Sequence, residues 1–211
     1  MKLGTIGCGN MAKAILGGIV GKGLIKPEEM IAADMYVPGL EAARQSMGIH
    51  ITTDNKEAAK ADVVLLAVKP DYYEGVIREI RDVVSEVIVW TIAPGITLSD
   101  MEKFFGRKVK AVRTMPNTPA MVGAGVTAVT PNEQVTEEEI RYICDLIGGF
   151  GSAELIPESL MDATISASAR PTLRYIWAKF RLHSPLCALH LGQISHKVGR
   201  TASGKQFSDT L

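Results

Sequence analysis

The sequence predicts an α/β fold over residues 1–162, a doubly wound sheet of parallel strands covered by helices. From residue 2 onward, short apolar runs alternate with longer segments of helical period, which is the pattern that builds such a sheet. A glycine-rich turn joins the first apolar run to the first helical segment. The chain has 211 residues, of which 46% are hydrophobic and 22% charged, so it is long enough to bury one sizeable core.

The expected elements follow in chain order. The first two strands are the short apolar runs at 2–6 and 30–33, and the next two, ADVVLLA at 61–67 and VIVWTI at 87–92, are rich in β-branched residues. Two further strands are expected at 109–113 and 125–129. Helices are predicted between the strands at 10–21, 38–47, 72–84, 98–105 and 137–147. Two of them begin with a cap pattern that satisfies free N–H groups, Thr97 with Asp100 and Thr136 with Glu139.

Composition and charge exclude several classes of protein. The 23 Lys and Arg residues balance 23 Asp and Glu, and the hydrophobic content rules out a disordered or collagen-like chain. No apolar run approaches the roughly 18 residues of a membrane span and no signal peptide is evident, so we expect a cytoplasmic protein without a membrane partner. Three scattered cysteines and four histidines without ligand spacing predict neither a disulfide framework nor a metal site.

Residues 163–211 differ in composition from the rest of the chain. They carry seven Lys and Arg against a single acid, Asp209, whereas residues 1–162 carry 16 basic and 22 acidic side chains. The periodic pattern weakens there, so we expect a basic tail that is poorly ordered or forms one short helix near 173–182. A basic arm for nucleic acid or membrane is the alternative. Because the charges follow no consistent face, we predict no nucleic-acid partner.

The strongest local motif is a G-x-G-x-x-A run that follows the first strand and opens the first helix. In such a motif Gly7 permits a tight turn, Gly9 lets a pyrophosphate approach the backbone, and Ala12 lets the helix pack closely on the strand. The helix start then presents unpaired N–H groups and a positive dipole end to the phosphates. An ordinary strand-to-helix turn is the alternative. The motif predicts a dinucleotide site that includes Ile6, Gly7, Cys8, Gly9, Asn10 and Met11, with Cys8 as a small packing residue.

Asp34 ends the second strand, where an acidic side chain accepts hydrogen bonds from the ribose of the adenosine. A carboxylate there favours NAD, because the 2′-phosphate of NADP would meet a like charge and no Lys or Arg follows at 35–37. The alternative is that Asp34 only turns the chain or caps the next helix.

Three further loops are expected at the carboxyl edge of the sheet, where doubly wound folds bind ligands. Two of them are candidates for the nicotinamide half: Ala67, Val68, Lys69 and Pro70 after one strand, and Ala93, Pro94 and Gly95 after the next. The third is Met115 to Thr118, where Pro116 and the following Pro119 predict a rigid loop that offers the amide of Asn117. Each loop taken alone is also typical of a structural turn. The absence of a G-x-S-x-G elbow makes a triad hydrolase a poor fit.

Four segments together resemble the pyrroline-5-carboxylate reductase family: IGCGNMAKAILGG at 6–18, AVKP at 67–70, IAPGITL at 92–98 and RTMPNTPAMVGAG at 113–125. The likeness continues through IPESLMDA at 156–163. The resemblance implies an N-terminal Rossmann domain that binds NADPH or NADH. It also implies a reductase that passes hydride to the C=N carbon of the small-molecule substrate 1-pyrroline-5-carboxylate and gives L-proline.

The resemblance implies roles by matching position. The loop Gly7–Met11 would hold the pyrophosphate, and Asp34 and Asn55 would face the adenosine ribose. Val68, Lys69 and Pro70 would line the path to the nicotinamide ribose, with Ala93, Pro94 and Gly95 beside the ring. The floor near the substrate would consist of Met115, Pro116, Asn117 and Thr118. Family members often prefer NADPH and commonly have a small polar residue in place of Asp34, so the cofactor stays open between NADP and NAD.

The resemblance stops after Ala163. The family continues with a turn ending in Gly-Pro-Ala-Tyr and then with helices that interlock two subunits and complete the substrate pocket, whereas this chain reads TISASARPTLRY. The codons of Ala169–Thr172, started one base earlier, permit Gly-Pro-Ala-Tyr, so a frame-shifted or truncated tail is our hypothesis. The catalytic residues are then unknown, and we expect little turnover from a 211-residue form. A catalytically incomplete NAD(P)-binding module, or another Rossmann imine or hydroxyacid reductase, remains the alternative.

Overall fold

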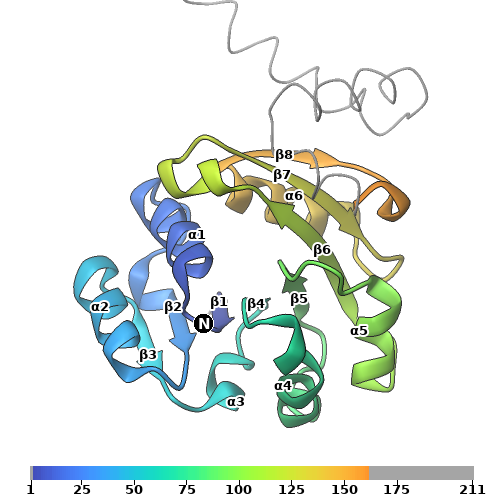
Figure 1. Cartoon of the computed structure of the whole chain (residues 1–211), viewed down its shortest axis with the longest axis horizontal. Coiled ribbons are helices and arrows are strands. Elements are labelled where there is room, and N and C mark those ends of the chain that lie inside the picture. The colour runs from blue at the N-terminus through green and yellow to red at the C-terminus, as the bar shows by residue number, and fades with distance from the viewer. Residues whose placement is uncertain (1, 162–211) are drawn as a thin grey trace, which may run out of the picture. The chain divides into compact units, whose positions relative to one another are not determined.

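One eight-stranded sheet organises residues 2–161, the part of the chain that the computed structural model describes (Figure 1). Its strand order is β3-β2-β1-β4-β5-β6-β7-β8. The bounds are β1 Leu3–Ile6, β2 Met30–Ala33, β3 His50–Thr52, β4 Val63–Leu66, β5 Ile88–Thr91, β6 Lys110–Pro116, β7 Gly125–Pro131 and β8 Gly151–Leu155. The first six strands are parallel to one another, with β1 between β2 and β4. The strand order reverses there, which makes the carboxyl end of β1 the switch point of the fold.

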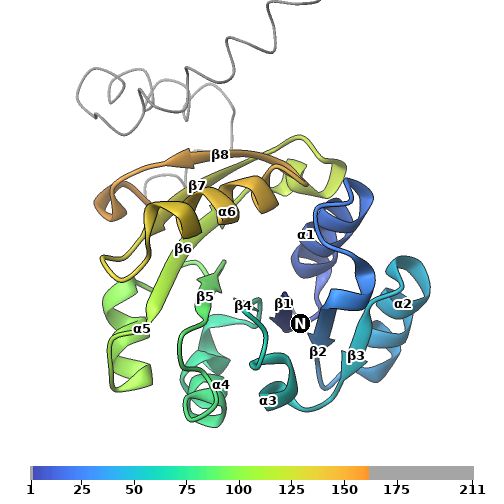
Figure 2. The same cartoon turned by 180° about the vertical axis from the view of Figure 1, so that it is seen from behind.

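Helices cover both faces of this sheet (Figures 1 and 2). One face packs against α1 (Asn10–Gly21), α2 (Val37–Met47) and α6 (Glu137–Ile147). The other packs against α3 (Asn55–Ala58), α4 (Tyr73–Ile80) and α5 (Leu98–Phe105). Because side chains alternate along a strand, neighbours such as Val63 and Val64 enter different core clusters. The predicted doubly wound α/β architecture is therefore confirmed.

Most predicted elements have the predicted bounds or nearly so. The helices 10–21, 98–105 and 137–147 match without change, and both predicted caps form reciprocal capping boxes, Thr97 with Asp100 and Thr136 with Glu139. The predicted helix 72–84 is shorter, because a 3₁₀ turn at Pro70–Tyr72 precedes α4 and the helix ends at Ile80. Three elements were missed, namely β3, α3 and β8. Each has only three to five residues and little apolar periodicity.

The prediction of an entirely parallel sheet is wrong at one edge. The strand β7 runs antiparallel to β6, pairing Pro116 with Thr127 and Val112 with Pro131, and β8 then pairs in parallel with β7. The connection from β6 to β7 is a single 3₁₀ segment, Thr118–Val122, which is too short for a crossover to the opposite edge. The pairing also carries β6 through Met115 and Pro116, so the first half of the predicted rigid loop is a strand end.

The predicted basic tail at 163–211 and its short helix near 173–182 lie outside the described residues. Within the described part of the chain, no helix has both the length and the apolar character that crossing a bilayer requires.

Candidate functional site

The predicted site loops come together at one edge of the sheet. Parallel strands end at the same edge, so the loops after β1, β4, β5 and β6 all emerge beside one another. In the described structure, the solvent-exposed members of the predicted set are Gly9, Asn10, Lys69, Pro70, Pro94, Gly95 and Thr118. The tertiary structure thus gathers segments that lie more than a hundred residues apart in the chain.

The two glycines of the first loop have different physical roles. Gly7 has φ +94° and is buried, and a Cβ there would lie 2.7 Å from the carbonyl carbon and oxygen of Ala67. It therefore permits the loop after β1 to press against the loop after β4. Gly9 has ordinary extended backbone (φ −75°), and nothing lies within 4 Å of the position that its Cβ would take. Any residue can adopt that conformation, so the backbone itself does not require glycine there, and the space around the missing Cβ is open.

The start of helix α1 suits an anion. No side chain caps it, its first turn carries no acidic residue, and Gly9 is its N-cap. The N–H groups of a first helical turn have no partner within the helix, and the helix dipole adds partial positive charge at this end. An uncapped helix start beneath the open space at Gly9 fits the pyrophosphate of a dinucleotide.

Cys8 lies between the two glycines and is buried. Burial raises the pKa of its thiol, with Lys13 opposing and Asp34 adding to this shift by their charges. The thiol therefore stays protonated at neutral pH and behaves as a small packing group, which agrees with the role expected from the sequence.

Asp34 connects the end of β2 to the glycine loop. Its Oδ2 accepts a hydrogen bond of 2.6 Å from the Cys8 backbone N–H, and its Oδ1 accepts one of 2.9 Å from the Tyr36 N–H. The second bond is the local chain-turning role that the sequence left as an alternative. The first is a long-range contact that places the carboxylate directly beside the predicted phosphate loop.

Asn55, which is predicted to face the adenosine ribose, begins helix α3 just beyond the end of β3. Its Nδ2 donates to Glu79 Oε2 of helix α4 at 2.9 Å, and the preceding Asp54 caps α3 by accepting from the Lys56 N–H. The donating end of the Asn55 amide is thus engaged in holding two helices together, and its oxygen is the end that remains for a ligand.

Tyr73, which the sequence reading missed, joins the two loops predicted to line the nicotinamide. Its buried hydroxyl lies 2.8 Å from the Leu66 carbonyl oxygen at the end of β4 and 2.7 Å from Thr91 Oγ1 at the end of β5. Burial raises the pKa of this phenol far above its usual value, so it remains neutral. Residues 67–70 follow Leu66 directly, and residues 93–95 begin two positions after Thr91. The signal in the sequence that could have identified it was a tyrosine near the expected start of a helix, three residues after Pro70.

Asn117 has a structural partner within the substrate-side loop. Its Oδ1 accepts from the Val126 N–H of β7 at 2.9 Å, which closes the turn between β6 and β7. The Asn117 oxygen is thus engaged in a structural turn, which is the alternative that the sequence left open for this loop. Met115, Pro116 and Asn117 are half-buried, and Thr118 is exposed.

A second connection missed by the sequence involves Arg113 and Glu158. The Arg113 side chain in β6 is only 1% exposed, and its Nη1 lies 3.3 Å from Glu158 Oε1. The same oxygen accepts from the Leu98 N–H, the first residue of α5, at 2.8 Å. Glu158 therefore ties the end of the described domain to the strand before Met115 and to the helix after Gly95.

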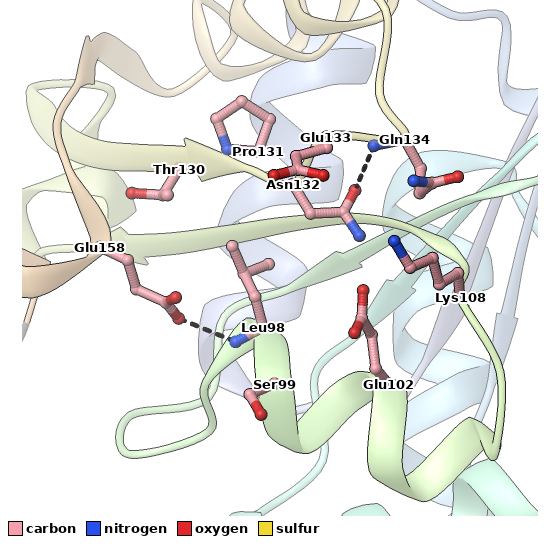
Figure 3. A pocket seen from close by; sticks show the side chains of 10 residues that line it. All are labelled: Leu98, Ser99, Glu102, Lys108, Thr130, Pro131, Asn132, Glu133, Gln134 and Glu158. Atoms are coloured by element: carbon pink, nitrogen blue, oxygen red, sulfur yellow. Dashed lines mark hydrogen bonds between the residues drawn. The ribbon is translucent and has the colours of Figure 1, made fainter.

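A groove of about 480 Å³ lies beside this connection, on the side of α5 (Figure 3). Glu158 and Leu98 contribute to one wall, and Asn132 faces them from the end of β7, hydrogen-bonded to the Gln134 N–H. None of the predicted dinucleotide residues lines the groove. Among residues 2–161, no cluster of three His, Cys, Asp or Glu side chains is arranged to hold a metal ion.

Comparison with known proteins relates these features to one family. The family model described as NADP oxidoreductase, coenzyme F420-dependent, matches residues 2–95, which include the glycine loop and Asp34. Pyrroline-5-carboxylate reductase of Escherichia coli (strain K12) is 37% identical over 169 residues, which are 79% of this chain and 63% of that protein. The Methanosarcina acetivorans protein of the same name is 34% identical over the same shares of both chains. The chain thus spans less than two thirds of the length of these relatives.

Solved structures give the same result. The structure of a pyrroline-5-carboxylate reductase from Coxiella burnetii superposes with a TM-score of 0.75 at 30% identity, covering 89% of this chain and 70% of that one. The Plasmodium falciparum pyrroline carboxylate reductase, solved with NADP bound, has a TM-score of 0.72 at 26% identity. With 30% identity to the Coxiella burnetii protein, 70% of which it covers, and 37% identity to the Escherichia coli protein, the chain belongs to the pyrroline-5-carboxylate reductase family.

Proposed function

We propose that this chain supplies the dinucleotide-binding part of a reductase that converts 1-pyrroline-5-carboxylate to L-proline, with NADH or NADPH as the hydride donor. The observation that carries the proposal is the open space at Gly9 above an uncapped start of helix α1. That arrangement gives a pyrophosphate both room and N–H donors. The names of the relatives supply the substrate.

Each loop of the carboxyl edge has a proposed role. The first turn of α1 binds the pyrophosphate, while Asp34 and the oxygen of Asn55 contact the adenosine ribose. The nicotinamide lies between Val68–Pro70 and Ala93–Gly95, whose spacing Tyr73 fixes. Met115–Thr118 forms the floor on the substrate side. When bound, the nicotinamide supplies the hydride that the imine carbon accepts, and a proton joins the imine nitrogen. We assign no proton donor among residues 2–161.

The substrate half of the site is proposed to come from the part of the relatives that this chain does not span. We also propose that the protein forms a homo-oligomer, as the family resemblance implies, and that it is located in the cytoplasm. A catalytically incomplete NAD(P)-binding module is the second candidate. It differs from the first candidate in turnover, because hydride transfer requires the imine to be held within a fraction of an ångström and no proton donor is assigned among residues 2–161.

The binding part of the proposal is tested by Gly9→Ala, with Gly21→Ala as its matched control. Gly9 is the N-cap of α1 and Gly21 is its last residue, and neither Cβ would meet an atom within 4 Å. Both variants should therefore fold with the stability of the wild type. We expect Gly9→Ala to weaken NADH and NADPH binding by about tenfold or more, since the new methyl occupies the phosphate space, while Gly21→Ala binds normally. Equal affinities in the two variants would place the dinucleotide elsewhere.

The catalytic part is tested by proline formation. The 211-residue chain is compared with a chimera that joins residues 1–163 to the remaining part of the Escherichia coli relative. We expect dinucleotide binding by both and NAD(P)H oxidation dependent on 1-pyrroline-5-carboxylate only by the chimera. Turnover by the 211-residue chain at the rate of an intact relative would contradict the incomplete-module candidate. A chimera that reduces a hydroxyacid or another imine instead would contradict the assigned substrate.

The proposed frame shift is tested by reading the coding DNA across codons 155 to 180 in all three frames. We expect the shifted frame to yield a Ser- and Gly-rich turn, Gly-Pro-Ala-Tyr and helix-forming sequence beyond. If no frame does so, residues 163–211 are the native continuation of this domain and the frame-shift hypothesis is rejected.

A further inference from the structure

Asp34 is held in one orientation at the place where the ribose of a dinucleotide is expected. Each of its carboxylate oxygens accepts a backbone hydrogen bond, Oδ2 from Cys8 at 2.6 Å and Oδ1 from Tyr36 at 2.9 Å. The two donors lie on either side of the carboxylate, one in the glycine loop and one in the turn before α2. A rotation of the side chain would break both bonds, so the carboxylate cannot swing away from a ligand at small cost.

The fixed carboxylate still has accepting capacity. A carboxylate has about four lone-pair positions, of which the two N–H donors occupy two. The remaining positions suit neutral hydroxyl donors such as those of a ribose. A 2′-phosphate offers no hydrogen to donate and brings about two negative charges at neutral pH, so it meets this group as a like charge.

The residues around Asp34 offer a phosphate little compensation. The three that follow, Met35, Tyr36 and Val37, are uncharged and exposed. The cation on the facing helix is Lys13, whose Nζ lies 3.7 Å from the position that a Cβ at Gly39 would take, next to the first turn of α2. The charge of Lys13 lowers the pKa of the Cys8 thiol and the charge of Asp34 raises it, so both charges lie near the glycine loop. Among the described residues, Lys13 is the cation that we identify as able to offset the repulsion between Asp34 and a 2′-phosphate.

From this arrangement we infer that Asp34 makes the site selective for NADH over NADPH. The inference rests on the proposed function only in requiring a dinucleotide on the Gly7–Met11 loop, and it does not require turnover. The inferred preference for NADH differs from the dinucleotide in the Plasmodium falciparum relative, whose structure was solved with NADP bound. The charge of the Asp34 carboxylate, held by Cys8 and Tyr36, is the specific cause.

The test is equilibrium binding of NADH and NADPH to the whole 211-residue chain, followed by the fluorescence of the reduced nicotinamide. We expect NADH to bind more tightly than NADPH by about tenfold to a hundredfold at low salt, with a smaller ratio at about 1 M NaCl because salt screens the repulsion. In Asp34→Ser the ratio should fall to about one or reverse. Asp34→Asn keeps the shape and removes the charge, but it also replaces one of the two accepting oxygens with an NH₂ group, so the ratio should fall while one backbone hydrogen bond is lost.

Asp82→Asn is the matched control. Asp82 lies just past the C-terminal end of α4 with its side chain 85% exposed, and because α4 runs against the strands, that end is at the opposite edge of the sheet. Its removal should leave the NADH to NADPH ratio unchanged. Equal binding of the two dinucleotides by the wild type would overturn the selectivity and leave the proposed function intact. In that case, loss of NADPH affinity in Lys13→Met would identify the compensating cation. If neither dinucleotide binds, both the selectivity and the proposed function fail.

Discussion

Glu158 holds the buried guanidinium of Arg113, with 3.3 Å between Glu158 Oε1 and Arg113 Nη1. Arg113 lies in β6 two residues before Met115, and Glu158 lies 45 positions further along the chain, near the end of the described domain. The same carboxylate accepts from the Leu98 N–H, three residues after Gly95. One side chain therefore links the strand that leads to the proposed substrate floor with the helix that follows a proposed nicotinamide loop.

Glu158→Ala is expected to lower the free energy of unfolding by about 2 kcal/mol, because it removes a charged partner from a buried Arg113 and an acceptor from Leu98. Glu158→Gln keeps the acceptor and should cost less. Urea unfolding followed by far-UV circular dichroism measures the change. Glu133→Ala is the control, since this exposed glutamate lines the same groove (Figure 3). A loss no larger than that of the control would mean that the Arg113 contact contributes nothing.

Gly7→Ala is expected to destabilise the fold as well as the proposed site. A Cβ there would lie 2.7 Å from the Ala67 backbone, and φ is +94°, where residues with side chains are strained. We expect a loss of about 2 kcal/mol or more in the free energy of unfolding, whereas Gly9→Ala should change it by less than about 0.5 kcal/mol. Both are measured by urea denaturation. Two variants of equal stability would show that the close approach of the two loops is easily relieved.

Tyr73→Phe tests the contact between the ends of β4 and β5. It removes the buried hydroxyl that meets the Leu66 carbonyl oxygen and Thr91 Oγ1, so we expect a loss of about 1–2 kcal/mol in the free energy of unfolding. Tyr72→Phe makes the same chemical change at the exposed neighbour and should be neutral. Thermal or urea unfolding distinguishes them. Matching curves for the two variants would remove Tyr73 from the account of loop spacing.

The stability of the domain should fall in alkali, and Cys144 should account for part of the fall. Burial, together with the charges of Asp145 and Glu154, raises the pKa of the Cys144 thiol from 9.0 to about 11. Between these values the folded state keeps a proton that the unfolded chain loses, so stability is complete below pH 9 and decreases toward pH 11. The free energy of unfolding, measured across this range, should decrease less in Cys144→Ala. An identical decrease in both proteins would exclude the thiol.

Several features followed from short-range sequence patterns. The capping boxes at Thr97 and Thr136 are determined by residues three apart, so they could be identified before any fold was known. The glycine loop was likewise recognisable, because strand, turn and helix are contiguous in the chain. The strand β8 was missed because its residues GSAEL include no β-branched or aromatic side chain, and pairing with β7 rather than propensity makes them a strand.

What the sequence by itself determined is the α/β class and the set of loops at the carboxyl edge. Local periodicity and turn chemistry are sufficient for both. The tertiary structure decided the direction of β7, the contact between Arg113 and Glu158, and the orientation of Asp34. These depend on groups brought together from distant positions, such as the Cys8 N–H that meets Asp34 across 26 residues. The sequence left the choice between NAD and NADP open, because the Asp34 carboxylate favours NAD whereas the family resemblance favours NADPH. The packing of the glycine loop against β2 fixes the carboxylate on which that choice depends.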